Sequence, residues 1–97
     1  MKARIEWLTE EQGGRPDLPK GPRYVTVARF YDEIEKYPKE AWSLVLEFTR
    51  TISRSLTEVA DVSFLVDEAP KHLLHEGSGF DLFEGRKLVA RGKVIGS

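Results

Sequence analysis

Apolar and polar residues alternate along several short segments of the chain, and this alternation predicts β-strands. Near the N-terminus, Ala3, Ile5 and Trp7 are separated by the charged residues Arg4 and Glu6. A period of two residues is typical of a strand with one buried face. The same kind of pattern recurs along the chain, and the segments together predict six strands, over residues 2–8, 24–30, 42–48, 60–66, 80–83 and 87–95.

The third of these segments also fits a helix. One set of its apolar residues has the spacing of a helical stripe, namely Ala41, Leu44, Val45, Phe48 and Ile52. Pro38 lies just upstream, and a β-branched, Ser/Thr-rich stretch follows; both features favour a strand. We therefore predict a strand over residues 42–48 and a loop or an edge extension over residues 49–57.

Glycine and proline mark the connections between the predicted strands. Residues 13–22 hold three Gly and three Pro and predict a long loop. Glu84-Gly85-Arg86 predicts the turn of a hairpin, and residues 71–74 predict one short helical turn. Six short strands with almost no helix indicate an all-β fold, either a small antiparallel barrel or a sandwich. We favour a closed six-stranded antiparallel β-barrel, because an open sheet would expose two edges and an apolar face.

Length and composition limit the class of protein. The chain has 97 residues, which suits a single domain over residues 1–97. It contains no Cys, so neither a disulfide nor a thiolate metal site can stabilise it. Charged residues follow Met1, and no apolar run is long enough to span a bilayer. We therefore expect a cytoplasmic protein that makes no membrane contact.

The net charge of −1 hides an uneven distribution of charge. Residues 1–30 carry six Lys or Arg against four Asp or Glu, and residues 84–97 carry four against one. Residues 31–83 carry five Lys or Arg against eleven Asp or Glu. A polyanion would be attracted to the two basic ends of the chain and repelled by its centre. This distribution argues against a uniformly basic nucleic-acid coat and allows only a localised contact.

Two stretches of the sequence resemble the third, C-terminal β-barrel domain of the translation elongation factor Tu family. "IEWLTEEQGGRPDLPKGPRYVTVARF" resembles that domain's opening strand, its long Gly-Gly-Arg turn, the Lys-Gly-x-Arg that follows and the next strand. "GFDLFEGRKLVARGKVI" resembles its closing hairpin. The two stretches cover under half of the chain. The resemblance implies a six-stranded antiparallel barrel of that type, here as a stand-alone domain.

In that family the Gly-Gly-Arg turn and the Glu-Gly hairpin lie close together and contact the T stem of aminoacyl-tRNA. The resemblance matches Arg15 to the turn arginine, and Glu84 and Gly85 to the hairpin pair. Pro16 stands where the family has a His, and Phe83 where it has an Arg, so two RNA-facing groups are replaced. These 97 residues hold no G-x-x-x-x-G-K-[ST] motif and are too few for a GTPase domain, so we do not expect a translation GTPase.

These observations lead us to expect a non-catalytic binding module for structured RNA that uses no cofactor and has no nucleoside triphosphate site. The candidate RNA-binding residues are Arg15, Lys20, Arg23, Glu84, Gly85, Arg86 and Lys87. Arg and Lys can contact phosphate oxygens, and a glycine permits close backbone approach. Two alternatives remain open. The same rim could contact a protein partner through Leu18 and Phe83, or the Gly- and Pro-rich stretch could be a solvated loop.

Two polar clusters suggest other chemistry. His72 and His75 lie near Glu68 and Glu76, but zinc needs three or four ligands in a fixed geometry, so we expect a surface turn. Asp32, Glu33 and Glu35 could form a carboxylate pair for acid/base catalysis. We expect a polar turn instead, because the sequence places no nucleophile or cation beside them. We therefore predict no metal site and no enzymatic activity.

Aromatic and basic residues elsewhere allow further interpretations. Bases could stack on aromatic side chains, but most of these side chains lie on alternating strands and should be core residues: Trp7, Trp42, Phe48, Phe64 and Phe80. Phe83 is predicted to lie at the hairpin turn and to be exposed. Arg50 and Arg54 could contact a partner or lie beside a phosphorylation site, and a polar loop explains them equally well.

Overall fold

The computed structural model describes residues 1–37, 39, 41–49, 52 and 54–96. These residues form six strands and three short 3-10 helices. The strands are β1 (Lys2–Trp7), β2 (Arg23–Phe30), β3 (Trp42–Phe48), β4 (Thr57–Phe64), β5 (Gly79–Glu84) and β6 (Lys87–Gly96). The 3-10 helices are η1 (Glu10–Gln12), η2 (Tyr31–Lys36) and η3 (Lys71–Leu73).

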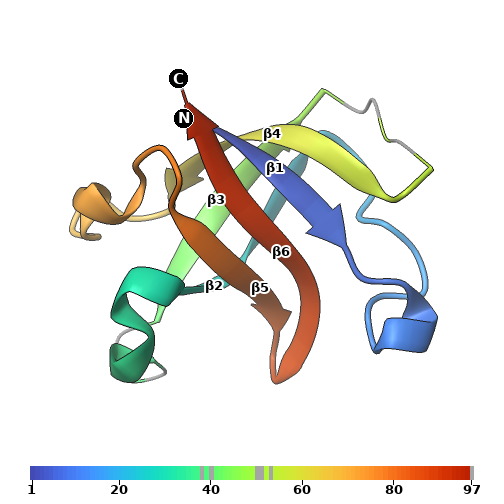
Figure 1. The fold of residues 1–97 in the computed structure, drawn as a ribbon, viewed down its shortest axis with the longest axis horizontal. Helices are drawn as coiled ribbons and strands as arrows, with labels where there is room; N and C mark the ends of the chain where they lie inside the picture. Colours follow the sequence, from blue (N-terminus) through green and yellow to red (C-terminus); the bar gives the residue numbers. More distant parts are fainter. Residues whose placement is uncertain (38, 40, 50–51, 53, 97) are drawn as a thin grey trace.

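The six strands form a closed antiparallel barrel, which confirms the predicted fold class. Around the barrel the order is β1-β4-β3-β2-β5-β6, so β1 pairs with β4 on one side and with β6 on the other. Figure 1 shows the two termini side by side at one end of the barrel, and Lys2 is paired with Gly96 there. The β5–β6 hairpin and the long loop after β1 lie at the opposite end.

The inside of the barrel is a single apolar core. Its fully buried members come from opposite sides of the barrel, and Ile5, Leu44, Leu46 and Phe80 are all 0% exposed. Trp7 and Phe48 are also buried, so these aromatic residues are core residues as predicted. Trp42 and Phe64 are half-buried, and Phe64 packs against the core. An alternating pattern thus buries one face of each strand, and closure removes the edges that an open sheet would expose.

Most predicted elements are confirmed, and the differences lie at their ends. Residues 42–48 form strand β3 and not a helix. The fourth strand was predicted over residues 60–66 but runs from Thr57 to Phe64. Val66 continues the inward apolar set of Ala60, Val62 and Phe64, yet it lies beyond the end of the strand and is 42% exposed. The short turn predicted at residues 71–74 is η3, whereas η1 and η2 were not predicted.

Helix η2 covers part of the outer surface of the barrel, beside β2 and β5. The ring of Tyr31 lies against Gly79, where an added Cβ would come within 2.6 Å of a ring carbon. The Tyr31 hydroxyl donates a hydrogen bond to Asp81, which is only 4% exposed. Burial, and then this hydrogen bond, raise the pKa of Tyr31 to about 12. Around Asp81, the outer face of β5 is therefore covered by Tyr31.

Gly92 in β6 should not tolerate a side chain. A Cβ added there would lie 2.3 Å from the ring of Phe80, which is itself fully buried. We expect Gly92→Ala to lower the free energy of unfolding by about 1–3 kcal/mol, since overpacking forces core side chains out of their preferred rotamers. Urea denaturation measures the difference. Ser63→Ala, at an exposed strand position, is the control and should change stability by less than about 0.5 kcal/mol; equal effects of the two changes would contradict this account.

Candidate functional site

The Gly-Gly pair after β1 has a structural cause. Thr9 caps η1, because its hydroxyl accepts a hydrogen bond from the Gln12 backbone N–H and its own N–H donates to the Gln12 side chain. Gly13 then ends η1 with φ of 91°, a conformation that favours glycine. Gly14 packs so closely that an added Cβ would lie 2.3 Å from the Leu8 carbonyl oxygen. Both glycines are therefore required by the backbone.

Arg15 connects this loop to the β5–β6 hairpin. Its guanidinium donates a hydrogen bond to the Glu84 carboxylate and lies over the Tyr24 ring, 5.9 Å from the ring centroid. Its Nε donates to the Asp17 carbonyl at 2.9 Å. The hydrogen bond to Glu84 raises the pKa of Arg15 above its ordinary value. The turn and the hairpin therefore meet, as the resemblance implied, but the charge of Arg15 is already compensated.

Glu84 is the centre of this cluster, because Tyr24 also donates its hydroxyl to the same carboxylate oxygen. Burial of Glu84 opposes ionisation, but hydrogen bonds from Tyr24 and Arg15 outweigh it, and the pKa of Glu84 is lowered. Burial, followed by the bond to the carboxylate, raises the pKa of Tyr24 to about 12. Glu84 is thus an ionised group that connects Arg15 and Tyr24, because both donate hydrogen bonds to its carboxylate.

The remaining cations of the predicted site point to solvent. We call the loop of residues 13–23 together with residues 84–87 the loop–hairpin rim. Its exposed cations are Lys20, Arg23, Arg86 and Lys87. Gly85 forms the tip of the hairpin with φ of 63° and has open space where a side chain would begin. Acidic groups are also present, because Asp17 is exposed and Glu47 lies opposite Arg23 in the β2–β3 pair.

The prediction of an exposed Phe83 is wrong. Strand β5 continues to Glu84, so Phe83 lies within the strand, and it is only 9% exposed. Tyr37 stacks on its ring at a centroid distance of 5.6 Å. The guanidinium of Arg29 lies 5.0 Å from its ring centroid and forms an ion pair with Asp81 at 2.5 Å. Sequence spacing could not show this, because the covering groups come from β2 and from the residue that follows η2.

Leu18 does not form an exposed apolar contact point either. It is half-buried and packs against the barrel core. The fold therefore uses Leu18 to attach the loop to the barrel, and the neighbouring Phe83 to hold the outer layer against β5. The rim therefore presents mainly charged side chains to solvent.

The two histidines face the acidic cluster across the surface. His75 Nε2 lies 2.9 Å from Asp32, and His72 Nε2 lies 3.5 Å from Glu33. The hydrogen bond to Asp32 raises the pKa of His75. No group of three or more potential metal-ligating side chains occurs among the residues that the structure describes. These contacts attach the turn after η3 to η2. Arg50 lies outside the described residues, and Arg54 is exposed.

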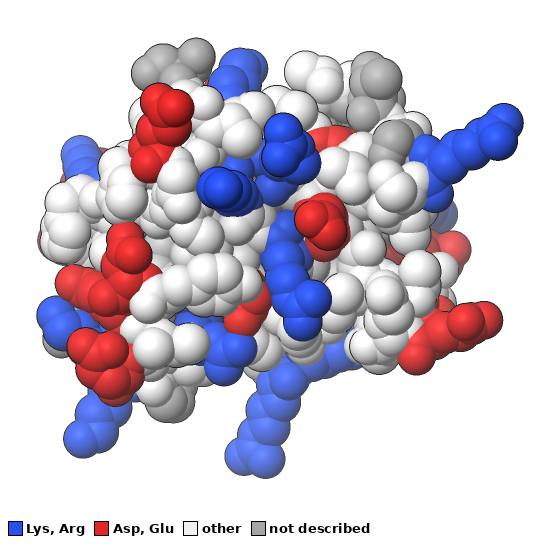
Figure 2. All heavy atoms as spheres, viewed as in Figure 1, with Lys and Arg blue, Asp and Glu red and all other residues white. Residues whose placement is uncertain are grey.

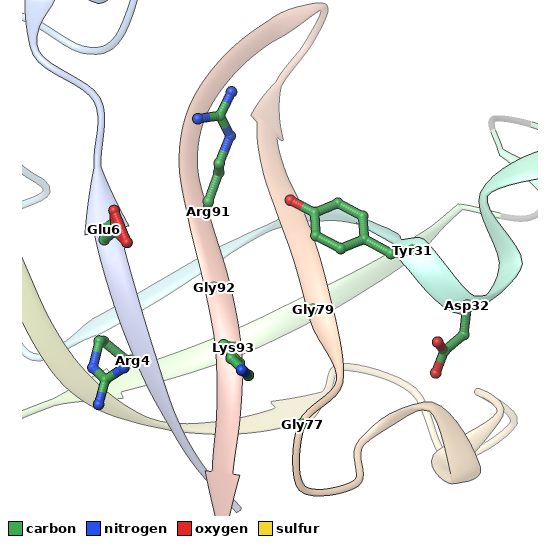
Figure 3. Close-up of a pocket in the computed structure, with 9 residues that line it drawn as sticks. All are labelled: Arg4, Glu6, Tyr31, Asp32, Gly77, Gly79, Arg91, Gly92 and Lys93. Atoms are coloured by element: carbon green, nitrogen blue, oxygen red, sulfur yellow. The ribbon is translucent and has the colours of Figure 1, made fainter.

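One cluster of functional interest was not predicted from the sequence. The outer surface of β1, β5 and β6 has a hollow of about 430 Å³, and its charged lining includes Arg4, Arg91 and Lys93 (Figure 3). Figure 2 shows Lys and Arg side chains gathered over the central part of this face. The alternation in β1 indicated that Arg4 faces outward. It could not indicate which residue of β6 lies beside it.

Comparisons of the chain with protein-family models, with curated proteins and with solved structures found no match. Among the described residues, no helix has both the length and the apolar character needed to cross a membrane.

Glu84→Gln should loosen the rim. The change removes the charge that Arg15 and Tyr24 share, and we expect a loss of roughly 1 kcal/mol in unfolding free energy at neutral pH, because the ion pair is partly exposed. A carboxyl group whose pKa is lowered by folding stabilises the folded state when the pH is above the pKa of the unfolded state. This stabilisation is lost as the pH falls through the pKa of the folded state. The difference between the parent and Glu84→Gln, measured by urea denaturation, should therefore shrink in acid. Glu47→Gln, an exposed strand position, is the matched control; a difference that is constant with pH would contradict the assignment.

His75 should titrate above the ordinary histidine pKa of about 6.5, and Asp32→Asn should lower its pKa. A histidine whose pKa is raised by folding stabilises the folded state when the pH is below the pKa of the unfolded state. This stabilisation is lost as the pH rises through the pKa of the folded state. Two-dimensional NMR of the imidazole protons measures the pKa in both proteins. Glu35→Gln, an exposed change on the same helix, should leave it unchanged. An unchanged pKa in Asp32→Asn would show that the carboxylate is not the cause.

Proposed function

We propose that this protein is a non-catalytic binding module whose loop–hairpin rim binds the phosphate backbone of structured RNA. The contact between Arg15 and Glu84 is the observation that carries the proposal. It holds the loop against the hairpin, so that Lys20, Arg86 and Lys87 belong to one end of the barrel. A ligand that spans several side chains could then contact the loop and the hairpin at the same time.

The chemistry of the rim suits phosphate contacts. Lys and Arg side chains bind phosphate oxygens through charge-assisted hydrogen bonds, and each neutralised phosphate releases counterions from the nucleic acid. The hairpin tip at Gly85 has no side chain, so a backbone could approach it closely. Arg15 has a positioning role in this proposal, because it already donates hydrogen bonds to Glu84 and to the Asp17 carbonyl and lies over the Tyr24 ring. Recognition would therefore depend on shape and phosphate spacing.

The state of the apolar residues favours RNA over a protein partner at this rim. A protein interface is usually anchored by apolar or aromatic side chains at its centre. Leu18 and Phe83 are the residues that could have served as such anchors, but Leu18 is half-buried against the core and Phe83 is only 9% exposed. Among the described charged side chains that the rim exposes, four are basic and Asp17 is the one acidic group. We therefore retain RNA as the proposed ligand and do not propose a protein adaptor.

Salt dependence and charge reversal test the proposal. We expect a pool of folded cellular RNA to bind the protein at about 50 mM salt and to bind more weakly at about 150 mM salt, since each phosphate contact contributes roughly 0.7–0.9 to the slope of log affinity against log salt. Lys20→Glu and Lys87→Glu should each weaken binding and reduce this slope by about the amount that one phosphate contact contributes. Filter binding measures both quantities.

Lys71→Glu is the matched control for these variants. Lys71 is an exposed cation in η3, at the other end of the barrel from the hairpin. Lys71→Glu changes the net charge by the same amount as Lys20→Glu and Lys87→Glu, so it measures the effect of net charge alone. Absence of binding even at the lower salt concentration would overturn the proposal. An equal loss in Lys71→Glu would remove the rim as the binding surface.

A further inference from the structure

The hollow on the outer surface of β1, β5 and β6 brings like charges together. Arg4 of β1 lies directly opposite Lys93 of β6 in the antiparallel pair. Figure 3 shows both side chains projecting from these neighbouring strands. Like charges directly opposite one another in a sheet are destabilising. Within the described part of the chain, neither side chain forms an ion pair that would offset this cost.

The surroundings of this cation pair are held in place by the outer layer. Arg91 lines the hollow two residues before Lys93, and its Nε lies 3.9 Å from the buried Asp81. Tyr31 forms a wall, fixed by its bond to Asp81 and by contact with Gly79. Gly77, Gly79 and Gly92 also line the hollow, so part of its surface is bare backbone. A ligand can therefore approach the strands between the basic side chains.

Acidic groups limit the size of that ligand. Glu6 of β1 lines the hollow and lies opposite Arg91 in the β1–β6 pair. Asp32 of η2 lines the hollow as well. Asp32 also accepts a hydrogen bond from His75. A polyanion that continued past Arg4 and Lys93 would meet these carboxylates. A compact anion needs to contact only the two cations, which lie directly opposite each other in the strand pair.

We propose that this hollow binds the phosphate group of a small phosphate monoester. The volume of about 430 Å³ lies within the range of roughly 300–1,000 Å³ that is usual for small-molecule sites. Arg4 can bind phosphate oxygens with two parallel N–H donors, and Lys93 supplies a second positive charge. A doubly charged phosphate monoester gains more from two adjacent cations than a singly charged diester does. The site is separate from the loop–hairpin rim and does not depend on RNA binding there.

Titration of the full chain with inorganic phosphate, followed by two-dimensional NMR, tests the assignment. Ionic strength is kept constant with sodium chloride at about pH 8, where phosphate is mainly the dianion. We expect saturable shifts at the backbone amides of Gly77, Gly92 and Lys93. Glycerol 2-phosphate should give the same pattern, and dimethyl phosphate, a diester, should bind more weakly. Thermal unfolding provides a second readout, because a ligand that binds the folded state raises the midpoint.

Arg4→Gln and Lys93→Gln should each weaken phosphate binding by about tenfold or more, as expected when a charged hydrogen-bond partner is lost. Lys2→Gln is the matched control, because Lys2 is also on β1 but pairs with Asp61 at 2.8 Å and does not line the hollow. Lys87→Glu at the rim should leave phosphate binding unchanged, which separates this site from the proposed RNA surface. Shifts that do not saturate, equal binding of dimethyl phosphate, or equal loss in Lys2→Gln would overturn the proposal.

Discussion

Pairing of β1 with both β4 and β6 is the constraint on which the rest of the structure depends. It joins the first strand to the last and leaves no strand edge open. Side chains reinforce it, because Lys2 pairs with Asp61 of β4 and Trp7 donates to Glu58 of the same strand at 2.6 Å. Closure also determines where the surfaces lie. The loop that follows β1 meets the hairpin that precedes β6, and the outward residues of these two strands stand side by side.

The outer layer on β2 and β5 decides which surface remains available. Asp81 and Phe83 occupy outward positions of a strand, yet they are 4% and 9% exposed. Arg29 makes this possible, since it pairs with Asp81 and lies over the rings of Phe83 and Tyr37. A buried carboxylate requires such partners, because desolvation of an isolated charge is costly. With this face covered, the basic residues of the two chain ends are presented at the rim and on β1 and β6.

The two basic surfaces differ in the way their charges are balanced. At the rim, one arginine is compensated by Glu84, and the remaining cations extend into solvent with an open hairpin tip between them. In the hollow, Arg4 and Lys93 face each other while Glu6 and Asp32 border them. An extended polyanion suits the first arrangement, and a compact anion suits the second. A net charge of −1 conceals both, since the acidic residues are concentrated in the middle of the chain.

The sequence by itself determined the number of strands, their approximate positions and the closed all-β fold, because a two-residue alternation is a local property that each segment shows alone. The resemblance of the two stretches led to the expectation that the Arg15 turn lies near the Glu84 hairpin, and the two are in contact. The sequence placed the end of β4 too late, since the apolar pattern continues to Val66 whereas the strand ends at Phe64. Only the tertiary structure decided that Phe83 is buried, that Arg15 is already paired and that Arg4 lies opposite Lys93. Each of these facts depends on the register and packing of segments far apart in the chain, which no local pattern contains.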